Sequence, residues 1–252
     1  MGDLTRKRVI HVEGTIGAGK SEILRLLSSL EDVTVVPEPV ENWTYFRGIN
    51  GLQLLYSDPK RNAYALQNLV FSTLARRSVP FTRRLTVFER SIQSSFHCFG
   101  KQLRNQGLLS ELEFGALDEL KNLLQSRIVG GLDVIIYLNV RPEVALDRIM
   151  QRNRPEEVEV RLPFLTELGQ LYDEWIGNLV SAGKEVYIVD ANRPIMEVGN
   201  ECFAVLERLG KGASTSTLTP PQDWNPANGG PIGFNQFNLT DIEDCCSTTK
   251  QQ

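Results

Sequence analysis

The sequence lacks the features of a membrane protein and of a disulfide-bonded secreted protein. None of its apolar runs approaches the roughly 18 residues that are needed to cross a bilayer. Its four cysteines show no Cys-x-x-Cys spacing and stand beside no histidine cluster, so neither a zinc site nor a disulfide framework is indicated. The first expected strand begins near Val9, too early for a signal or transit peptide. We therefore expect a cytoplasmic protein with no membrane partner.

The chain also lacks an excess of positive charge. It carries 27 Lys and Arg residues against 31 Asp and Glu residues, a formal net charge of -4. No general basic field is present to attract a nucleic acid polymer, so we expect no such partner. With 41% hydrophobic and 23% charged residues, the 252-residue chain has the composition of an ordinary globular α/β protein.

The most informative stretch is residues 14–21, a complete Walker A motif between an apolar run and a pattern of helical period. The glycines of such a loop let the backbone wrap around phosphate oxygens, and its amides point at the anion. Lys20 is placed to reach the β- and γ-phosphates, and the Ser21 hydroxyl to ligate Mg²⁺. We predict that a nucleoside triphosphate binds here. The predicted contacts come from Gly14, Thr15, Ile16, Gly17, Ala18, Gly19, Lys20 and Ser21.

Short apolar runs alternate with longer stretches of helical period, which is typical of βαβ units and a parallel sheet. We predict a single α/β domain over residues 1–210. From residue 211 onward no periodic apolar face remains, so a disordered tail is expected over residues 211–252. The predicted strands lie near 8–13, 33–36, 85–89, 133–139 and 185–190, and the predicted helices near 20–30, 50–56, 60–77, 91–106, 110–130, 141–153, 161–182 and 194–209.

Two predicted strands end in charged residues, at the sheet edge where open α/β folds bind ligands. Glu38 precedes a proline, which favours an extended backbone there. We expect Glu38 to face the γ-phosphate and to accept a proton from an alcohol acceptor. Glu89 and Arg90 would ordinarily be a surface ion pair. At this edge we expect Glu89 to hold Mg²⁺ as a Walker B acid and Arg90 to lie near Glu38.

Three arginines, Arg148, Arg152 and Arg154, fall within seven residues after the fourth predicted strand. A solvated charged face is the common explanation for such a run. In a P-loop fold this position instead suggests a lid that closes guanidinium groups over the triphosphate and excludes water.

Several side chains between these motifs suggest a slot for a nucleobase. Trp43, Tyr56 and Phe99 would supply aromatic faces, and the Gln67 amide would read the edge of a ring held between them.

In combination, these motifs resemble the deoxynucleoside kinase family, over about residues 8–192. The resemblance implies a P-loop kinase fold with a five-stranded parallel sheet, an arginine lid, ATP as the donor with Mg²⁺, and a homodimer packed through helices. It also implies that Glu38 deprotonates the 5′-hydroxyl of a deoxynucleoside and that Arg90 steadies Glu38. The motifs that carry it are residues 14–21, 38–43, 56–60, 67, 89–91 and 148–157.

The same resemblance implies roles for the remaining site residues. Tyr56 and Glu157 match residues that hold the 3′-hydroxyl, and Gln67 matches the residue that hydrogen-bonds the base. Trp43 and Phe99 match the aromatic walls, and Arg152 and Arg154 match the arginines of the lid.

Pyrimidine deoxynucleosides are the predicted substrates. The Gln67 amide carries a donor and an acceptor, so it can pair with a thymine or a cytosine edge. Val70, Leu74 and Ser95 would leave a compact, mostly apolar end that suits the thymine methyl group. Leu66 stands where the family commonly has Phe, so purines remain expected as weak substrates.

Two other functions are compatible with a Walker loop in this fold. A nucleoside monophosphate kinase has an anionic acceptor and needs no general base, so Glu38 argues against it. A non-catalytic nucleotide-binding subunit of the same fold would be expected to have lost Lys20, Glu38 or Arg90, and all three are present.

Overall fold

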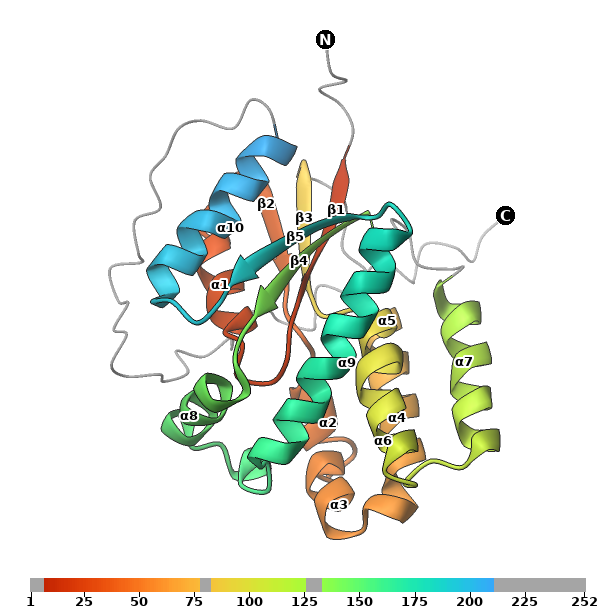
Figure 1. The fold of residues 1–252 in the computed structure, drawn as a ribbon. Helices are drawn as coiled ribbons and strands as arrows, with labels where there is room; N and C mark the ends of the chain where they lie inside the picture. The colour runs from red at the N-terminus through yellow and green to blue at the C-terminus, as the bar shows by residue number, and fades with distance from the viewer. Residues whose placement is uncertain (1–6, 78–82, 126–132, 211–252) are drawn as a thin grey trace. The chain divides into compact units, whose positions relative to one another are not determined.

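The computed structural model describes residues 7–77, 83–125 and 133–210. Their centre is a five-stranded parallel sheet with the order β2-β3-β1-β4-β5. All carboxyl ends of the strands therefore meet at one edge (Figure 1). The predicted α/β fold class is confirmed, and the strands lie within one residue of their predicted positions. They are β1 (Arg8–Glu13), β2 (Val33–Val36), β3 (Leu85–Glu89), β4 (Val134–Asn139) and β5 (Glu185–Asp190).

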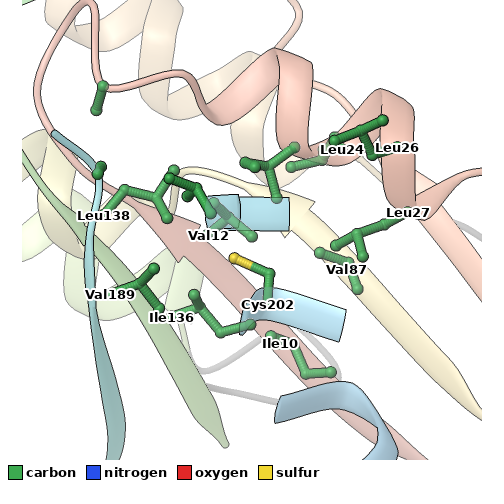
Figure 2. Packing of buried hydrophobic residues seen from close by; sticks show 14 of the residues in the cluster. Ile10, Val12, Leu24, Leu26, Leu27, Val87, Ile136, Leu138, Val189 and Cys202 are labelled. Carbon is green, nitrogen blue, oxygen red and sulfur yellow. The ribbon is translucent and has the colours of Figure 1, made fainter. Parts of the chain in front are cut away.

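Helices cover both faces of the sheet, because apolar side chains point to both faces from alternate positions along its strands. Ile10 and Val12 of β1 pack in one cluster with α1 (Lys20–Leu27) and α10 (Ile195–Leu209), as Figure 2 shows. Ile135 and Tyr137 of β4 belong to another cluster, which includes the buried side of α9 (Leu162–Ser181). Successive residues of a strand point to opposite faces, so three layers result: helices, sheet, helices.

A separate apolar cluster joins the helices around α4, and Trp43 belongs to it. Along the chain, two further segments connect β4 to α9: α8 (Pro142–Arg152) and the 3₁₀ turn η2 (Pro155–Glu157). The helices before β4 are α2 (Glu41–Thr44), α3 (Gly51–Ser57), α4 (Pro59–Ala75), α5 (Ile92–Ser94), the π-helix η1 (Ser95–Gly100), α6 (Lys101–Asn105) and α7 (Glu111–Gln125).

The helix predicted near residues 91–106 is present over residues 92–105, but it is not an α-helix throughout. The segment is divided by the π-helix η1, whose wider turn lets neighbouring side chains reach different clusters. Phe96 packs in the cluster around α4, whereas Cys98 packs against the α9 side of the sheet. The apolar pattern of a sequence does not distinguish a helical turn with hydrogen bonds between residues i and i+4 from one with hydrogen bonds between i and i+5. The sequence therefore did not reveal the π-helix.

Other predictions differ at the ends of elements or fall outside the described part of the chain. The first helix ends at Leu27 rather than residue 30, because residues 28–30 turn into β2. The end of the helix predicted over 110–130 and the tail predicted over 211–252 lie outside the described residues. Among the described helices, none is both long and apolar enough to cross a membrane.

Candidate active site

The loop between β1 and α1 has a backbone shape that requires glycine. Gly17 has a φ of +80°, and a β-carbon there would lie 2.4 Å from the carbonyl oxygen of Ala145. A β-carbon at Gly14 would lie 2.9 Å from the carbonyl oxygen of Leu138. Both distances are shorter than van der Waals contact, so the segment from β4 to α8 leaves no room for a side chain. Gly19, also at positive φ, is the N-cap of α1.

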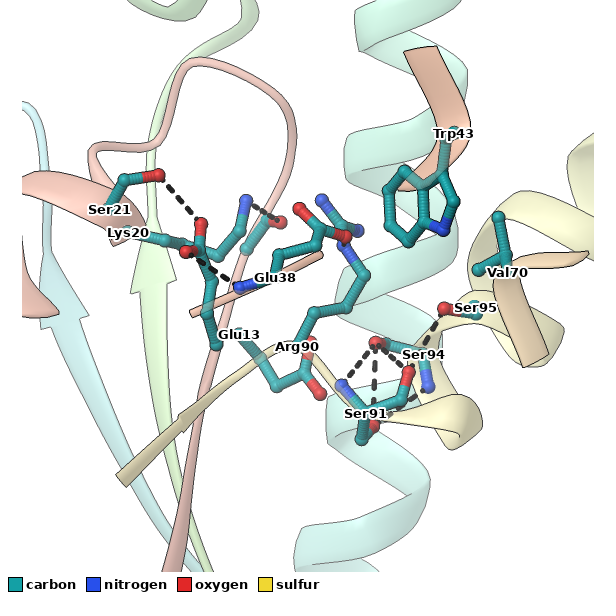
Figure 3. A network of polar contacts seen from close by, with 12 residues as sticks. Glu13, Lys20, Ser21, Glu38, Trp43, Val70, Arg90, Ser91, Ser94 and Ser95 are labelled. Atoms are coloured by element: carbon teal, nitrogen blue, oxygen red, sulfur yellow. Dashed lines mark hydrogen bonds and ion pairs between the residues drawn. The ribbon is translucent and has the colours of Figure 1, made fainter. Parts of the chain in front are cut away.

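Lys20 and Ser21 begin α1 and turn their side chains back toward the loop and the sheet. The buried Lys20 Nζ donates to the carbonyls of Gly14 and Thr15, at 3.0 and 2.8 Å. Burial lowers the pKa of Lys20 to about 8, and the nearby Arg90 cation acts in the same direction. Ser21 Oγ donates to Glu89 Oε1 at 2.8 Å, which joins the loop to the end of β3 (Figure 3).

Glu89 connects the loop to the segment that carries Glu38. Its Oε2 accepts from the backbone N–H of Glu38 at 3.3 Å. Burial raises the pKa of Glu89, and the neighbouring Glu38 carboxylate raises it further.

The oxygen atoms of Ser21 and Glu89 fit Mg²⁺, which prefers hard oxygen ligands. Mg²⁺ usually binds through one or two carboxylates and takes its other ligands from phosphates and water. In the described part of the chain, no group of three or more His, Cys, Asp or Glu side chains could hold a metal. The small number of protein oxygens is the arrangement expected of a site that is completed by nucleotide phosphates.

Glu38 and Arg90 form an ion pair between Glu38 Oε1 and Arg90 Nε. The two side chains are only 10% and 6% exposed, and the guanidinium lies 4.3 Å from the centroid of the Phe99 ring. Burial alone would lower the pKa of Arg90, but the carboxylates around it, Glu38 foremost, raise it above its usual value. Arg90 is therefore a permanent cation beside the Glu38 carboxylate.

Arg90 holds this position with a strained backbone. Its φ of +61° is in the left-handed region, which is costly for a residue with a side chain. Its N–H donates to the carbonyl of Val12 at 3.0 Å, and its own carbonyl accepts from Arg77 at 2.6 Å. Arg77 also donates to the carbonyl of Glu89. Sequence reasoning did not identify Arg77, and no motif marks it.

The residues predicted to hold a base lie on α2, α4 and η1. Trp43 Nε1 donates to Thr73 Oγ1 at 2.8 Å, which fixes the indole ring. Gln67 is buried, and its Oε1 has no hydrogen-bond partner among the described residues. An unpaired buried acceptor is costly, so it marks a place where a ligand donor would bind. Val70 and Leu74 share the cluster of Trp43, and Ser95 is also buried. Figure 3 draws Trp43, Val70 and Ser95.

The predicted lid residues lie on α8 and η2. A guanidinium nitrogen of Arg148 is 4.0 Å from the β-carbon position of Gly19, so Arg148 lies against the phosphate loop. Arg152 pairs with Glu157 at 2.6 Å, and Arg154 lies 3.9 Å from the same carboxylate. The structure therefore shows two of these arginines held by Glu157, and it does not show a closed lid.

Tyr56 lies near the lid segment. Burial raises the pKa of its hydroxyl to about 12, and the negative charge of Glu157 raises it in the same direction. Tyr56 and Glu157, predicted to share one ligand hydroxyl, thus come together from α3 and η2.

Two further site residues were missed by sequence reasoning. Glu13, the last residue of β1, and Tyr172 of α9 lie behind Arg90 and are both fully buried. A signal for Glu13 was present, because it directly precedes Gly14 at the carboxyl end of a strand. Tyr172 had none, since it reads as one more member of an apolar helix face.

Comparison with known proteins places the chain in a family. A family model described as "Deoxynucleoside kinase" matches residues 10–211. Human mitochondrial thymidine kinase 2 is 34% identical over 190 residues, which cover 74% of this chain and 72% of that protein. Deoxycytidine kinase 2 of Gallus gallus is 32% identical over 199 residues, 68% of this chain and 74% of that protein. Mitochondrial deoxyguanosine kinase of Xenopus laevis is 32% identical over 194 residues, with 66% and 72% covered.

Proposed function

The chain belongs to the deoxynucleoside kinase family, and we propose from this that it transfers the γ-phosphoryl group of ATP to the 5′-hydroxyl of a deoxynucleoside. Membership makes the protein a kinase that phosphorylates nucleosides. The donor, the acceptor preference and the residue roles are our proposals.

The observation that carries the proposal is the position of the Glu38 carboxylate. Glu38 is linked through Glu89 to Ser21 of the phosphate loop, and it pairs with the buried cation of Arg90. A hydroxyl acceptor must lose a proton as it attacks a phosphoryl group, and a carboxylate in this position serves as the general base. An acceptor that is already a phosphate would need no such base.

The donor side is formed by the loop and the lid. Lys20 and the loop amides would bind the β- and γ-phosphates, and Arg148, Arg152 and Arg154 would close over them. Ser21 and Glu89 would hold Mg²⁺, which would neutralise the negative charge that develops during phosphoryl transfer. Closure requires Arg152 and Arg154 to turn from Glu157 toward the phosphates. Glu157 would then lose its two arginine partners and contact the ligand instead.

We propose thymidine and deoxycytidine as the preferred acceptors. Support comes from the buried Gln67 amide, whose acceptor atom is unpaired in the described structure, and from the apolar Val70 and Leu74 beside Trp43. The relatives include thymidine, deoxycytidine and deoxyguanosine kinases, so their names do not decide between bases.

A panel of acceptors tests the reaction and the preference together. The full-length protein would be assayed with ATP and Mg²⁺ on the four deoxynucleosides and their monophosphates. We expect phosphorylation of deoxynucleosides, with higher kcat/KM for thymidine and deoxycytidine. Phosphorylation of the monophosphates alone would overturn the reaction, and a purine deoxynucleoside with the highest kcat/KM would overturn the preference.

We also propose a homodimer and a cytoplasmic location, on the resemblance and composition alone. Light scattering of the purified protein and imaging of the tagged full-length chain test the two.

A further inference from the structure

We infer that Tyr172 and Glu13 are positioning residues that hold the Arg90 guanidinium against Glu38. The inference rests on the proposed function, because it concerns how the proposed base and its cation are kept in place.

The contacts form a chain across three elements. Arg90 NH1 donates to Tyr172 OH at 2.9 Å, and Tyr172 OH donates to Glu13 Oε2 at 3.5 Å. On its other edge, Arg90 uses Nε for the pair with Glu38. A guanidinium is a rigid plane with its donors in a fixed fork, so holding Nε and NH1 determines its orientation. Without the Tyr172 contact, the side-chain contacts left to the Arg90 guanidinium among the described residues would be those with Glu38 and the Phe99 ring.

Packing against other aromatic rings fixes the position of the Tyr172 ring. Tyr172 is fully buried, its ring stacks on Tyr137 at 5.8 Å with an interplanar angle of 7°, and its edge meets Phe99 at 6.3 Å. Phe99 also lies against Arg90, so the Phe99 ring contacts both Tyr172 and the guanidinium. A phenylalanine would fill the same space. The hydroxyl is therefore what Tyr172 adds, since it alone can accept from Arg90 and donate onward.

Glu13 supplies the acceptor for the hydroxyl proton of Tyr172. Its carboxyl is fully buried behind the loop, and its Oε1 lacks a hydrogen-bond partner within the described structure. Burying such a group costs free energy and contributes nothing to apolar packing. As an acceptor for Tyr172, it orients the hydroxyl so that the oxygen lone pairs face Arg90.

Glu13 has several charged and polar neighbours. Burial raises its pKa, and the hydroxyls of Ser91 and Ser94 with the cations of Arg90 and Lys20 lower it. Lys20 belongs to the phosphate loop, so the charges of both cationic groups of the proposed reaction act on Glu13.

Tyr172→Phe tests the inference, with Tyr137→Phe as a matched control. Tyr137 is a buried tyrosine in the adjacent stacked position, and its hydroxyl bonds to Asp173 at 3.0 Å rather than to Arg90. We expect Tyr172→Phe to lower kcat roughly tenfold to a hundredfold, the loss that corresponds to a buried hydrogen bond to a charged group. The KM for the deoxynucleoside should change by less than about threefold. Tyr137→Phe should keep a kcat close to that of the wild type.

Two substitutions at Glu13 separate hydrogen bonding from packing. Glu13→Gln keeps an acceptor for Tyr172, whereas Glu13→Leu removes it. We expect the glutamine variant to retain more of the kcat than the leucine variant at equal folded fraction, measured by thermal melting. If Tyr172→Phe does not fold, this pair decides the question: equal kcat in the two variants would overturn the inference.

A crystal structure of Tyr172→Phe gives a readout that does not depend on activity. We expect the Arg90 guanidinium to rotate away from the Glu38 carboxylate. An unchanged Arg90, or a kcat equal to that of Tyr137→Phe, would overturn the inference. A wild-type protein without kinase activity would instead overturn the proposed function, and the crystal structure would still decide whether Tyr172 positions Arg90.

Discussion

At the residue scale, the site depends on a few buried charges. Arg90, Glu38, Glu89 and Lys20 lie close together, and each is mostly removed from water. Interactions between charges are stronger where water is excluded, so the protonation state of each group depends on its neighbours. In the function that we propose, the Glu38 carboxylate beside the Arg90 guanidinium is what would suit the site to transfer to a hydroxyl.

Glu38→Gln should lower kcat while deoxynucleoside binding survives. The amide keeps the size and part of the hydrogen bonding, but it is a far poorer base, and general-base catalysis contributes on the order of 10² to 10⁴ in rate. Steady-state kinetics would measure kcat, and calorimetry would measure binding of thymidine. Glu41→Gln is the control, because Glu41 is an exposed glutamate on the following helix. Near-normal turnover, with the chemical step shown to limit the rate, would exclude Glu38 as the base.

At the element scale, the phosphate loop and α8 are built against each other. The loop passes so close to Ala145 that only glycine fits at position 17, and Arg148 of the same helix reaches back over Gly19. The helix that begins the proposed lid therefore also supports the loop that would bind phosphate. A displacement of either element should therefore displace the other.

Gly17→Ala should destabilise the protein and weaken nucleotide binding. The new methyl group would meet backbone atoms of Ala145, which cannot rotate away as a side chain could. Gly48→Ala is the matched control, because Gly48 also has a positive φ of +82° but a β-carbon there meets no atom within 4 Å. We expect the control to cost about 1 kcal/mol and Gly17→Ala to cost more. Chemical denaturation and ATP titration measure the two effects. Equal costs in both variants would show that the loop relaxes around the methyl group.

Arg152→Ala and Arg154→Ala should each lower kcat, because each removes a cation proposed to stabilise charge on the transferring phosphoryl group. The expected loss of kcat is about tenfold or more. Loss of an exposed ion pair alone would change stability only slightly and would leave kcat near the wild-type value. Arg104→Ala removes a comparable arginine from a pair with Glu111 on α6 and α7, and should leave kcat unchanged. If kcat stays at the wild-type value in both lid variants, the run of arginines is only a charged surface.

At the scale of the whole molecule, burial of ionisable groups links the stability of the fold to pH. His11 lies in the central strand, where its ring stacks on Phe88. Burial lowers its pKa from 6.5 to about 3, with a further contribution from Arg77. The unfolded state therefore binds more protons between pH 6.5 and about 3, and the contribution of neutral His11 to stability is lost as the pH falls through this window.

His11→Leu should reduce this loss. Between pH 7.5 and pH 5 the wild-type protein should lose about 2 kcal/mol more unfolding free energy than the variant. Urea denaturation at the two pH values measures both losses. Glu13 and Glu89 are present in the wild type and in the variant. The difference between the two losses of unfolding free energy is therefore due to His11. The same loss in wild type and variant would contradict the shifted pKa.

The local elements and the chemistry of the loops could be predicted from the amino-acid sequence. The strands follow from short apolar runs, and the phosphate loop follows from a motif whose spacing is imposed by the phosphate itself. Glu38, Glu89 and Arg90 were identified because strand ends in a parallel sheet meet at one edge, so their neighbourhood follows from strand order alone.

How these groups are held depends on contacts between distant parts of the chain. The π-helix at residues 95–100 depends on how two clusters divide Phe96 and Cys98 between them, which no local period records. The contacts of Arg90 with Tyr172 and of Tyr172 with Glu13 join residues 82 and 159 positions apart. Such contacts depend on the packing of α9 against the sheet. A tyrosine in a buried helix face has the same pattern in the sequence whether its hydroxyl meets solvent, a backbone carbonyl or the guanidinium of an arginine.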